Sequence, residues 1–249
     1  MKIAVCLKRV PDTTTKIVIG SDGASIDETG VKFVPNPFDE FAIEAAIAVK
    51  EAAGSGETVV YSLGGDSAQE TIRTALAMGI DRGVLLQGSG SPDGLEVAKA
   101  LAGELKDQGF DLILFGKLAV DDYNYQVGPM TAELLGLPCI TSLAHVTVAD
   151  GKVEAEREIE GGMETSTCQL PAVLTCDKGL NTPRLPSLKG IMAAKKKPLE
   201  VKAVDLGAGT IEILGLELPP ERSAGKIVGE GPDAVPELVN LLRNEAKVI

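Results

Sequence analysis

The chain has 249 residues, 44% hydrophobic and 24% charged, enough apolar material for one α/β domain with an appendage. Its net charge of −12 opposes attraction to nucleic acid or anionic lipid, and aromatic residues are only 3% with no Trp to stack on bases. No apolar run approaches the roughly 20 residues that span a bilayer, so we expect a protein that is not inserted in a membrane.

The N-terminal run MKIAVCLKRV lacks the long apolar region and cleavage site of a signal peptide, so it is interpreted as a first buried strand. The four cysteines form no CxxC pair, and free thiols are typical of a reducing compartment. We therefore expect a cytoplasmic protein of a bacterium or archaeon. The cysteines are Cys6, Cys139, Cys168 and Cys176.

Apolar runs and helical patterns alternate along the first 143 residues. The runs KIAVCL, TVVYSL, GVLLQ and DLILFG are too hydrophobic to leave one face in water, which is typical of buried parallel strands. Between or after them come helical patterns at residues 39–54, 67–79, 94–109 and 124–136, the second with Ser67 as its expected N-cap. This alternation predicts a doubly wound, mostly parallel α/β sheet.

The pattern changes from Ala144 onward. HVTVADGKVEAE alternates around an Asp-Gly turn and predicts a hairpin added to the sheet. The last 18 residues predict an amphipathic helix with Val235, Leu238, Leu241 and Leu242 on one face. Residues 196–232 have little to bury against themselves, so we expect an α/β domain over residues 1–195 and an extended C-terminal arm over 196–249 that wraps around another molecule.

Ligands of doubly wound sheets bind outside the carboxyl ends of the strands, where the strand order changes direction. Three loops should meet there: those after KIAVCLKRV, in SLGGDSAQE, and in GKLAVDDYNYQVG. Small residues and backbone N–H groups in SLGGDS suit an anion. Asp121 and Asp122 suit ribose hydroxyls or an adenine amino group, leaving the phosphate to backbone amides and Gln126. Two capped helix starts with no ligand fit the pattern equally well.

Catalytic constellations are missing from the sequence. His145, the one histidine, has no evident nucleophile beside it, and a structural role is expected for it. HExxH, Walker lysine and GxGxxG motifs do not occur, and a metal site would need more His or Cys. A binding or carrier role is therefore favoured over bond-making chemistry.

The basic residues are concentrated in one segment. Residues 178–202 hold seven Lys or Arg and one acid, which is +6, and subtraction from −12 leaves −18 for the rest of the chain. The segment also carries apolar residues at Leu185, Leu188, Ile191 and Met192. This combination predicts a docking element that steers a partner by charge and fixes it by an apolar anchor, with a solvated charged run as the alternative.

Five stretches in order resemble the small (beta) subunit of electron-transfer flavoproteins, and the resemblance covers almost the whole chain. They are VKFVPNPFDEFAIEAA, AQETIRTALAMGIDRG, GKLAVDDYNYQVG, REIEGGMET with LPAVLTCD, and LNTPRLPSLKGIMAAKKKPLEV. The resemblance implies a Rossmann-like, adenine-nucleotide-binding domain and a heterodimer whose alpha subunit holds most of the FAD site. It also implies electron transfer from acyl-CoA or related dehydrogenases of fatty acid β-oxidation to a quinone-linked oxidoreductase.

In this family the beta chain commonly binds AMP as a structural ligand. The matching positions imply contacts from Cys6, Asn36, Pro37, Phe38, Asp39, Leu63, Gly116, Ala119, Asp121, Asp122, Tyr123, Asn124, Tyr125, Gln126 and Val127. The run Gln126–Pro129 also resembles electron-bifurcating relatives that hold a second FAD in this site. However, Asp122, Tyr123 and Tyr125 depart from their motif, so we expect AMP, with bifurcation and a stand-alone nucleotide sensor as alternatives.

The resemblance also gives the basic segment a role. Residues 178–198 match the recognition loop that docks on acyl-CoA dehydrogenases, and Leu188 matches the leucine that enters the dehydrogenase surface. Glu158 matches a carboxylate that contacts the mobile flavin domain, where an exposed ion pair is weak enough to break. The expected docking residues are Arg184, Leu185, Leu188, Ile191, Met192, Lys195, Lys196 and Lys197.

Overall fold

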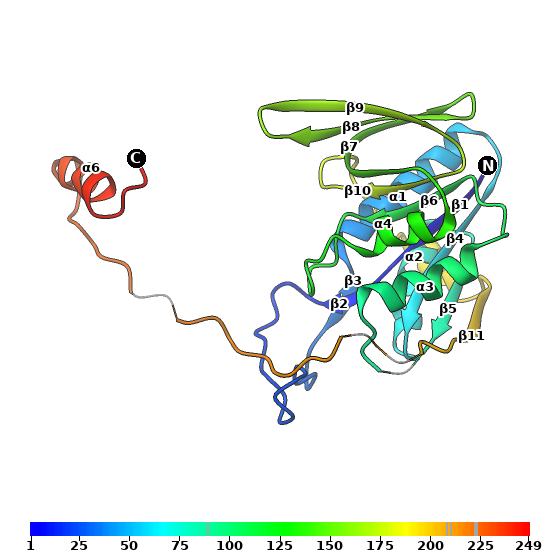
Figure 1. Cartoon of the computed structure of the whole chain (residues 1–249), viewed down its shortest axis with the longest axis horizontal. Helices are drawn as coiled ribbons and strands as arrows, with labels where there is room; N and C mark the ends of the chain where they lie inside the picture. The colour runs from blue at the N-terminus through cyan, green and yellow to red at the C-terminus, as the bar shows by residue number, and fades with distance from the viewer. Residues whose placement is uncertain (89, 208, 210, 222–223) are drawn as a thin grey trace.

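A single large sheet forms the centre of the structure, a computed structural model that describes residues 1–88, 90–207, 209, 211–221 and 224–249. Within these residues it has nine strands in the order β11-β5-β4-β1-β6-β10-β7-β8-β9, and β2 and β3 form a separate ribbon (Figure 1). The strands are β1 (Lys2–Cys6), β2 (Arg9–Pro11), β3 (Phe33–Pro35), β4 (Glu57–Gly64), β5 (Arg82–Gln87), β6 (Leu112–Gly116), β7 (Cys139–Ala149), β8 (Lys152–Ile159), β9 (Gly162–Gln169), β10 (Ala172–Cys176) and β11 (Leu199–Ala203).

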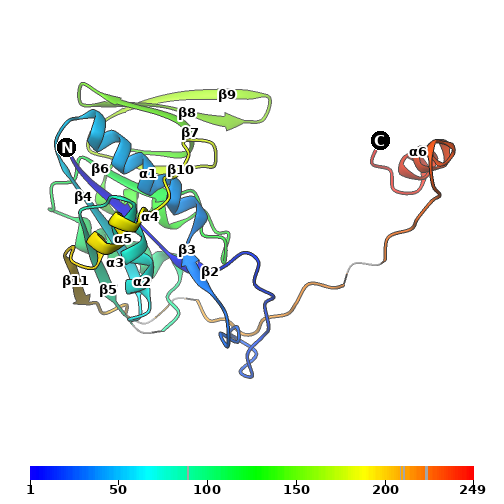
Figure 2. The same cartoon turned by 180° about the vertical axis from the view of Figure 1, so that it is seen from behind.

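Helices cover both faces of the sheet. The helices α3 and α4 lie in front of it in Figure 1, and α1, α2 and α5 lie in front of it in the reverse view of Figure 2. The helices are α1 (Pro37–Ala52), α2 (Ala68–Met78), α3 (Gly94–Leu105), α4 (Val127–Leu135), α5 (Leu188–Ala194), the short 3₁₀ turn η1 (Pro232–Ala234) and α6 (Val235–Asn244). The doubly wound α/β fold predicted from the sequence is confirmed.

The central strand β1 shows why polar residues do not alternate with apolar residues in the strand-forming runs. Its Ile3 and Val5 pack into the core beneath α1 and α2, whereas Ala4 and Cys6 pack into the core beneath α3 and α4. Side chains of a strand point alternately to the two faces, so a strand covered on both sides needs apolar residues throughout. Complete burial of each large aliphatic side chain stabilises the fold by about 1.5–3 kcal/mol.

The strand order reverses beside β1. The chain runs outward from β1 through α1 and β4 to α2 and β5, then crosses by α3 to β6 on the other side of β1. Both β4 and β6 are parallel to β1. The carboxyl ends of β1 and β6 therefore mark the point at which doubly wound sheets bind ligands.

The predicted hairpin is confirmed, and the structure extends it. The strands β7 and β8 are antiparallel and are joined at Asp150 and Gly151, whose φ angles of 51° and 74° are those of the tight turn that Asp-Gly favours. The strand β9, which the sequence pattern did not predict, then pairs antiparallel with β8 along its full length. The polar side chains of β9 reflect its place at the edge of the sheet, with one face exposed.

The sheet continues past the expected domain boundary at residue 195. The strand β11 pairs in parallel with β5, which would otherwise be an edge strand, and Leu199 packs against the core. After β11, Val204 still packs against the core and Leu206 lies beside α3; the chain then extends away from the sheet and ends in the predicted amphipathic helix, α6 (Figure 1). No side chain of α6 is buried. None of the described helices combines the length and apolarity needed to cross a bilayer.

Candidate functional site

Lys8 lies immediately beyond β1, at the point where the strand order reverses. Its Nζ forms ion pairs with Asp121 Oδ1 at 2.9 Å and Asp122 Oδ2 at 3.0 Å in the loop after β6. Partial burial disfavours its charge, but the hydrogen bonds and charges of the two aspartates outweigh this and raise the pKa of Lys8. This lysine was not among the residues expected from the sequence, because only the fold brings positions 8 and 121 together.

Asn36 and Asp39 hold the loop after β6 in place through hydrogen bonds to its backbone. The Asn36 Nδ2 donates to Asp39 Oδ1 (2.9 Å) and to the Leu118 carbonyl oxygen (2.8 Å), while its Oδ1 accepts from Val120 N (3.2 Å). Both residues are buried. Gly116 is required here, since a Cβ would collide with Asp39 and with the backbone of Phe38. These side chains therefore hold the loop in shape from within the protein.

The buried carboxylate of Asp39 accepts three N–H donors, from Lys8 N at 2.7 Å, Asn36 Nδ2 at 2.9 Å and Gly116 N at 3.0 Å. Burial raises the pKa of Asp39 to about 7. The three N–H donors favour the charged carboxylate and lower the pKa, but they do not outweigh burial. Burial, and then the neighbouring Asp39, raises the pKa of the Cys6 thiol well above its usual value. Cys6 is thus a neutral packing group and not a nucleophile.

The turn from Asp121 to Gln126 is exposed and has an unusual backbone. Tyr123 and Tyr125 both have a φ of 57°, a left-handed conformation that is uncommon for a bulky residue. Their rings meet edge to face, 6.0 Å apart, and are 62% and 46% exposed. Pairs of exposed rings in strained backbone suit the face of a flat ligand.

The loop after β4 lies at the same edge of the sheet, beside the chain that follows β1, because β4 is the parallel neighbour of β1. Leu63 is half-buried near the end of β4, and the Ser62 hydroxyl is buried without a hydrogen-bond partner among the described residues. Ser67 occupies the N-cap position of α2, but its side chain makes no capping hydrogen bond, contrary to expectation, since its backbone is already helical. The Oε1 of Gln126 lies close to Gly94 at the start of α3.

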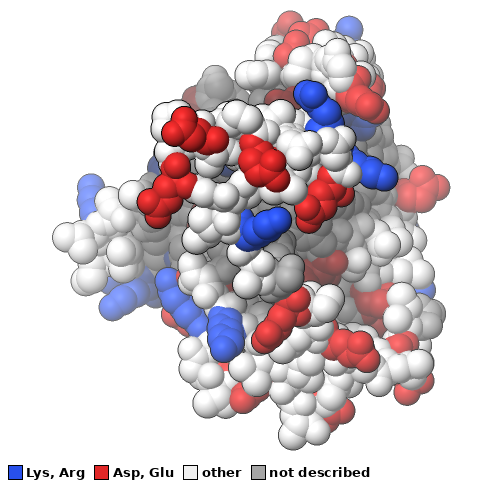
Figure 3. All heavy atoms as spheres, turned by 90° about the vertical axis from the view of Figure 1, so that its left-hand side faces the viewer, with Lys and Arg blue, Asp and Glu red and all other residues white. Residues whose placement is uncertain are grey.

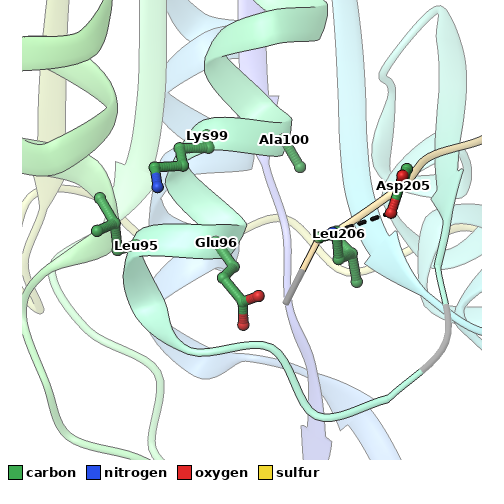
Figure 4. Close-up of a pocket in the computed structure, with 7 residues that line it drawn as sticks. Leu95, Glu96, Lys99, Ala100, Asp205 and Leu206 are labelled. Carbon is green, nitrogen blue, oxygen red and sulfur yellow. Dashed lines mark hydrogen bonds between the residues drawn. The ribbon is translucent and has the colours of Figure 1, made fainter. Parts of the chain in front are cut away.

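A concave region of about 330 Å³ lies elsewhere, between the first turns of α3 and the chain after β11 (Figure 4). Glu96 and Lys99 project from α3 there, and Asp205 and Leu206 lie across from them. The backbone N–H groups of Leu95 and Glu96 already donate to Asp93, so the start of α3 offers no evident anion site. The residues predicted to bind a nucleotide gather instead at the ends of β1, β4 and β6.

The docking segment, residues 178–198, presents large apolar side chains to solvent. Leu185 and Leu188 are 90% and 85% exposed, and Ile191 and Met192 follow on the short helix α5. The N-cap Ser187 accepts a hydrogen bond from Gly190 N, which fixes the start of this helix. The lysines of the segment other than Lys197 are exposed. The expected combination of apolar anchor and positive charge is therefore present at the surface.

Two cations expected to face a partner are engaged within the chain. Arg184 binds Glu44 and Glu51 of α1 through its guanidinium, and these carboxylates hold its pKa above the usual value. Lys197 donates to the carbonyl oxygens of Leu76 and Ile80 at the end of α2. Both residues attach the docking segment to the body, and their role in docking stays a prediction.

The outer face of β7, β8 and β9 carries the remaining residues singled out in the sequence. Glu158 is exposed near the end of β8, opposite Met163 of β9, and His145 is exposed opposite Glu156. Among the described residues no group of three or more His, Cys, Asp or Glu side chains could hold a metal ion. Figure 3 shows the molecule from the side of the arm, with acidic and basic side chains interspersed and without one broad patch of either sign.

Comparison with known proteins gives a consistent result along the whole chain. A family model described as "Electron transfer flavoprotein domain" matches residues 23–206. The chain is 44% identical to an electron transfer flavoprotein subunit beta of Bacillus subtilis over 260 residues, with all of both chains covered. It is 41% identical to the subunit of the same name from Syntrophomonas wolfei, covering 100% of this chain and 98% of the relative. The Mus musculus subunit is 44% identical, with 96% of each chain covered.

Proposed function

Because the chain belongs to the family of electron transfer flavoprotein beta subunits, we propose that it forms a heterodimeric electron carrier with an alpha subunit. The heterodimer accepts electrons from acyl-CoA or related dehydrogenases and passes them to a quinone-linked oxidoreductase. The alpha subunit holds most of the FAD, whose flavin carries the electrons. This chain provides the scaffold, a nucleotide site and the surface on which the donor docks.

The docking segment is the observation that carries this proposal. Leu188 extends into solvent from the first residue of α5, although full burial of a leucine is favourable by about 1.5–3 kcal/mol. An exposed apolar cluster among uncompensated lysines suits a partner that approaches by charge and is fixed by apolar contact. Replacement Leu188→Ala should raise the KM of an acyl-CoA dehydrogenase for the heterodimer about tenfold, while Leu134→Ala, an exposed leucine of α4, should not.

The arm and Glu158 complete the proposed assembly. We assign the contact with the alpha subunit to residues 204–249, in which Leu214, Ile227 and Val248 are large apolar side chains exposed to solvent. Glu158 contacts the flavin domain from the outer face of β8, where an exposed ion pair is weak enough to break as the domain moves. The proposed division is thus a body that ends with β11 and an arm devoted to the partner subunit.

We also propose that AMP binds at the carboxyl ends of β1, β4 and β6. The groups present suit a mononucleotide: the Lys8 ammonium for phosphate and the tyrosine rings for a base. Carboxylates of Asp121 and Asp122 neutralise Lys8 until a phosphate competes for it. The network of Asn36 and Asp39 fixes the loop on which these groups stand.

The nucleotides released by heat from the purified heterodimer test this assignment. One FAD and one AMP per heterodimer are expected. Two FAD and no AMP would instead support the bifurcating alternative. That alternative rests on the resemblance of Gln126–Pro129, at the start of α4, to electron-bifurcating relatives. An FAD without any second nucleotide would contradict both.

Two lysines of the first strand region give a matched test of the site. Lys8→Met should cause loss of AMP during purification while FAD is retained. Lys2→Met is the control, since Lys2 lies at the opposite end of β1 and donates to the Gln108 carbonyl oxygen. Equal AMP retention in the two variants would show that Lys8 does not hold the nucleotide.

A further inference from the structure

A groove of about 620 Å³ lies between α2 and α5, beside the exposed leucines of the docking segment. Half of its lining is apolar and half is polar or charged: Ala77, Pro186, Ile191 and Ala194, and Glu70, Arg73, Thr74 and Lys195. Its volume falls within the ~300–1,000 Å³ that protein pockets for small ligands occupy. The groove is thus large enough for one or two bulky side chains.

The two helices that form this groove are fastened to each other at their carboxyl ends. Arg73 of α2 donates to the carbonyl oxygens of Ala194 (2.6 Å) and Lys197 (2.7 Å) beyond α5. Lys197 in turn donates to Leu76 (2.9 Å) and Ile80 (2.6 Å) at the end of α2. One carbonyl in the last turn of each helix, Leu76 in α2 and Ala194 in α5, thus accepts from a cation, an arrangement that also suits the helix dipoles.

Close backbone contact fixes the width of the groove. A Cβ at Gly190 would collide with the Ala77 carbonyl oxygen, so α5 lies directly on α2. A groove held by backbone contact and four hydrogen bonds exists before any partner arrives. Preorganisation of this kind lowers the entropy cost of binding.

The groove is continuous with the apolar docking surface. Ile191 lines the groove and is 44% exposed, and Leu188 lies three residues earlier, on the same side of α5. A partner surface that covers both Leu188 and Ile191 passes over the mouth of the groove, because Ile191 lines it. Burying one without filling the other would leave a void against the partner.

We propose that the groove between α2 and α5 receives a bulky apolar side chain of the docked electron-donating dehydrogenase. Docking is then reciprocal: Leu188 enters the dehydrogenase, and a dehydrogenase side chain enters this chain. The charges indicate what flanks that side chain, namely a basic group near Glu70 and an acidic group near Lys195. This inference rests on the proposed docking function.

The surroundings of the groove favour a transient partner over the alpha subunit. Lys189, Lys195 and Lys196 are exposed around it. Lysine is depleted in the buried centres of stable interfaces, whereas exposed lysines accelerate encounters with a partner that binds and leaves. The apolar arm, by contrast, supplies a surface for the permanent partner.

Filling the groove tests the proposal. Thr74 lines it, and its hydroxyl bonds only within α2, to the Glu70 carbonyl oxygen at 3.2 Å. Thr74→Phe should raise the KM of an acyl-CoA dehydrogenase, supplied with its acyl-CoA, for the heterodimer about tenfold with little change in kcat. Glu133→Phe adds the same ring to an exposed position of α4, outside the groove, and should leave KM unchanged. An unchanged KM in Thr74→Phe would overturn the proposal.

Further variants separate the possible failures. If Leu188→Ala has no effect, the docking function itself fails; if Leu188→Ala weakens docking and Thr74→Phe does not, only the groove fails. Loss of the heterodimer on size exclusion with Thr74→Phe would assign the groove to the alpha subunit and overturn the proposal. Glu70→Lys, an exposed change that does not depend on packing, should also raise KM at low salt, and no effect there would contradict the expected basic neighbour.

Discussion

The docking segment and the C-terminal arm both expose large apolar side chains, but the rest of the chain supports them differently. Leu185 and Leu188 of the docking segment are 90% and 85% exposed, and Leu214 and Ile227 of the arm are 90% and 87% exposed. The docking segment is fastened to α1 and α2 by arginine and lysine side chains. The start of the arm contacts the body, where Val204 packs against the core and Leu206 lies beside α3, and farther along Leu216 N donates to Gly23 O (2.7 Å).

This difference indicates two kinds of partner. A rigid support presents its side chains in one arrangement, so little entropy is lost when a partner binds, which suits repeated docking and release. An unsupported apolar segment gains order only when it is covered, as segments that fold on binding do, and a large permanent surface compensates for that ordering. The exposed leucines of the two regions are therefore alike in chemistry and different in function.

Removal of the arm should have the largest effect on the molecule. A chain that ends at Ala203 keeps the whole sheet, because β11 is its last strand. We expect its affinity for the alpha subunit to fall by about 100-fold or more, which size-exclusion chromatography of the coexpressed subunits would show as separate species. Leu241→Asp on the apolar face of α6 should weaken assembly, and Asn244→Asp, at the exposed end of the helix, should not. A truncated chain that assembles normally would remove the distinction between the two regions.

The loop after β6 resembles the docking segment, because it is exposed and is held by side chains from another part of the chain. Its support includes the buried Asp39 and therefore depends on pH. Asp39 has a pKa of about 7 in the folded protein against 3.8 for a free aspartate. Between these values the folded state binds more protons than the unfolded state, so the contribution of Asp39 to stability is full below pH 4 and falls as pH rises through 7. The stability of the wild type relative to Asp39→Asn should therefore fall over that range, by at most roughly 4 kcal/mol.

Urea unfolding of the two proteins at several pH values measures this difference. Asp39→Asn also places an amide among N–H donors, which shifts its stability by a constant amount and does not alter the slope. A slope of the opposite sign would mean that the three N–H donors outweigh burial and that Asp39 is charged throughout.

Loss of Arg184 should loosen the docking segment from its support. Glu44 is buried, and Arg184→Gln leaves its carboxylate without the guanidinium. For a partly exposed pair we expect a loss of about 1–3 kcal/mol, a decrease in Tm of about 3–10 °C. Lys189→Gln, in the same segment but exposed, should leave Tm unchanged in the same thermal scan. Equal Tm values for both variants would show that the segment needs no anchor on α1.

The sequence predicted those parts of the fold that local pattern determines. The strand β1 is apolar on both faces and the helix α2 is amphipathic over three turns, so each could be read from its own residues. The helix α5 and the strand β11 have no such pattern. Seven residues of α5 are helical because Ser187 caps them and α2 supports them, and β11 is extended because β5 offers an open edge.

The candidate site was predictable in place but not in its internal contacts. Strand order alone indicates that the ends of β1 and β6 meet, and the family resemblance supplies Asn36 to Asp39 and the loop after Gly116. Ion pairs such as Lys8 with Asp121 join residues more than 100 positions apart and leave no trace in either local sequence. The same holds for Arg184 and Lys197, whose positive charges predict docking and whose contacts with carboxylates of α1 and carbonyl oxygens at the end of α2 only the structure shows.

The three consecutive lysines that follow α5 give the smallest expected change in KM. They also give a direct contrast between two exposed lysines and one that is bound within the chain. Lys195 and Lys196 are exposed, so replacing both with Gln should raise the KM for the heterodimer about threefold at low salt. The increase should vanish near 1 M salt, where the Debye length falls to about 3 Å. Stopped-flow measurement of the association rate at several ionic strengths checks this.

Lys197→Gln should behave in the opposite way, because Lys197 is a structural link between α2 and α5. Burial lowers the pKa of its ammonium, and its hydrogen bonds to Leu76 and Ile80 turn it away from an approaching partner. Its loss should lower Tm and should leave the salt dependence of association as in the wild type. If Lys197→Gln instead flattened the salt dependence as much as the double variant, charge at this position would steer the partner, and the support of the docking segment would not be separate from its docking surface.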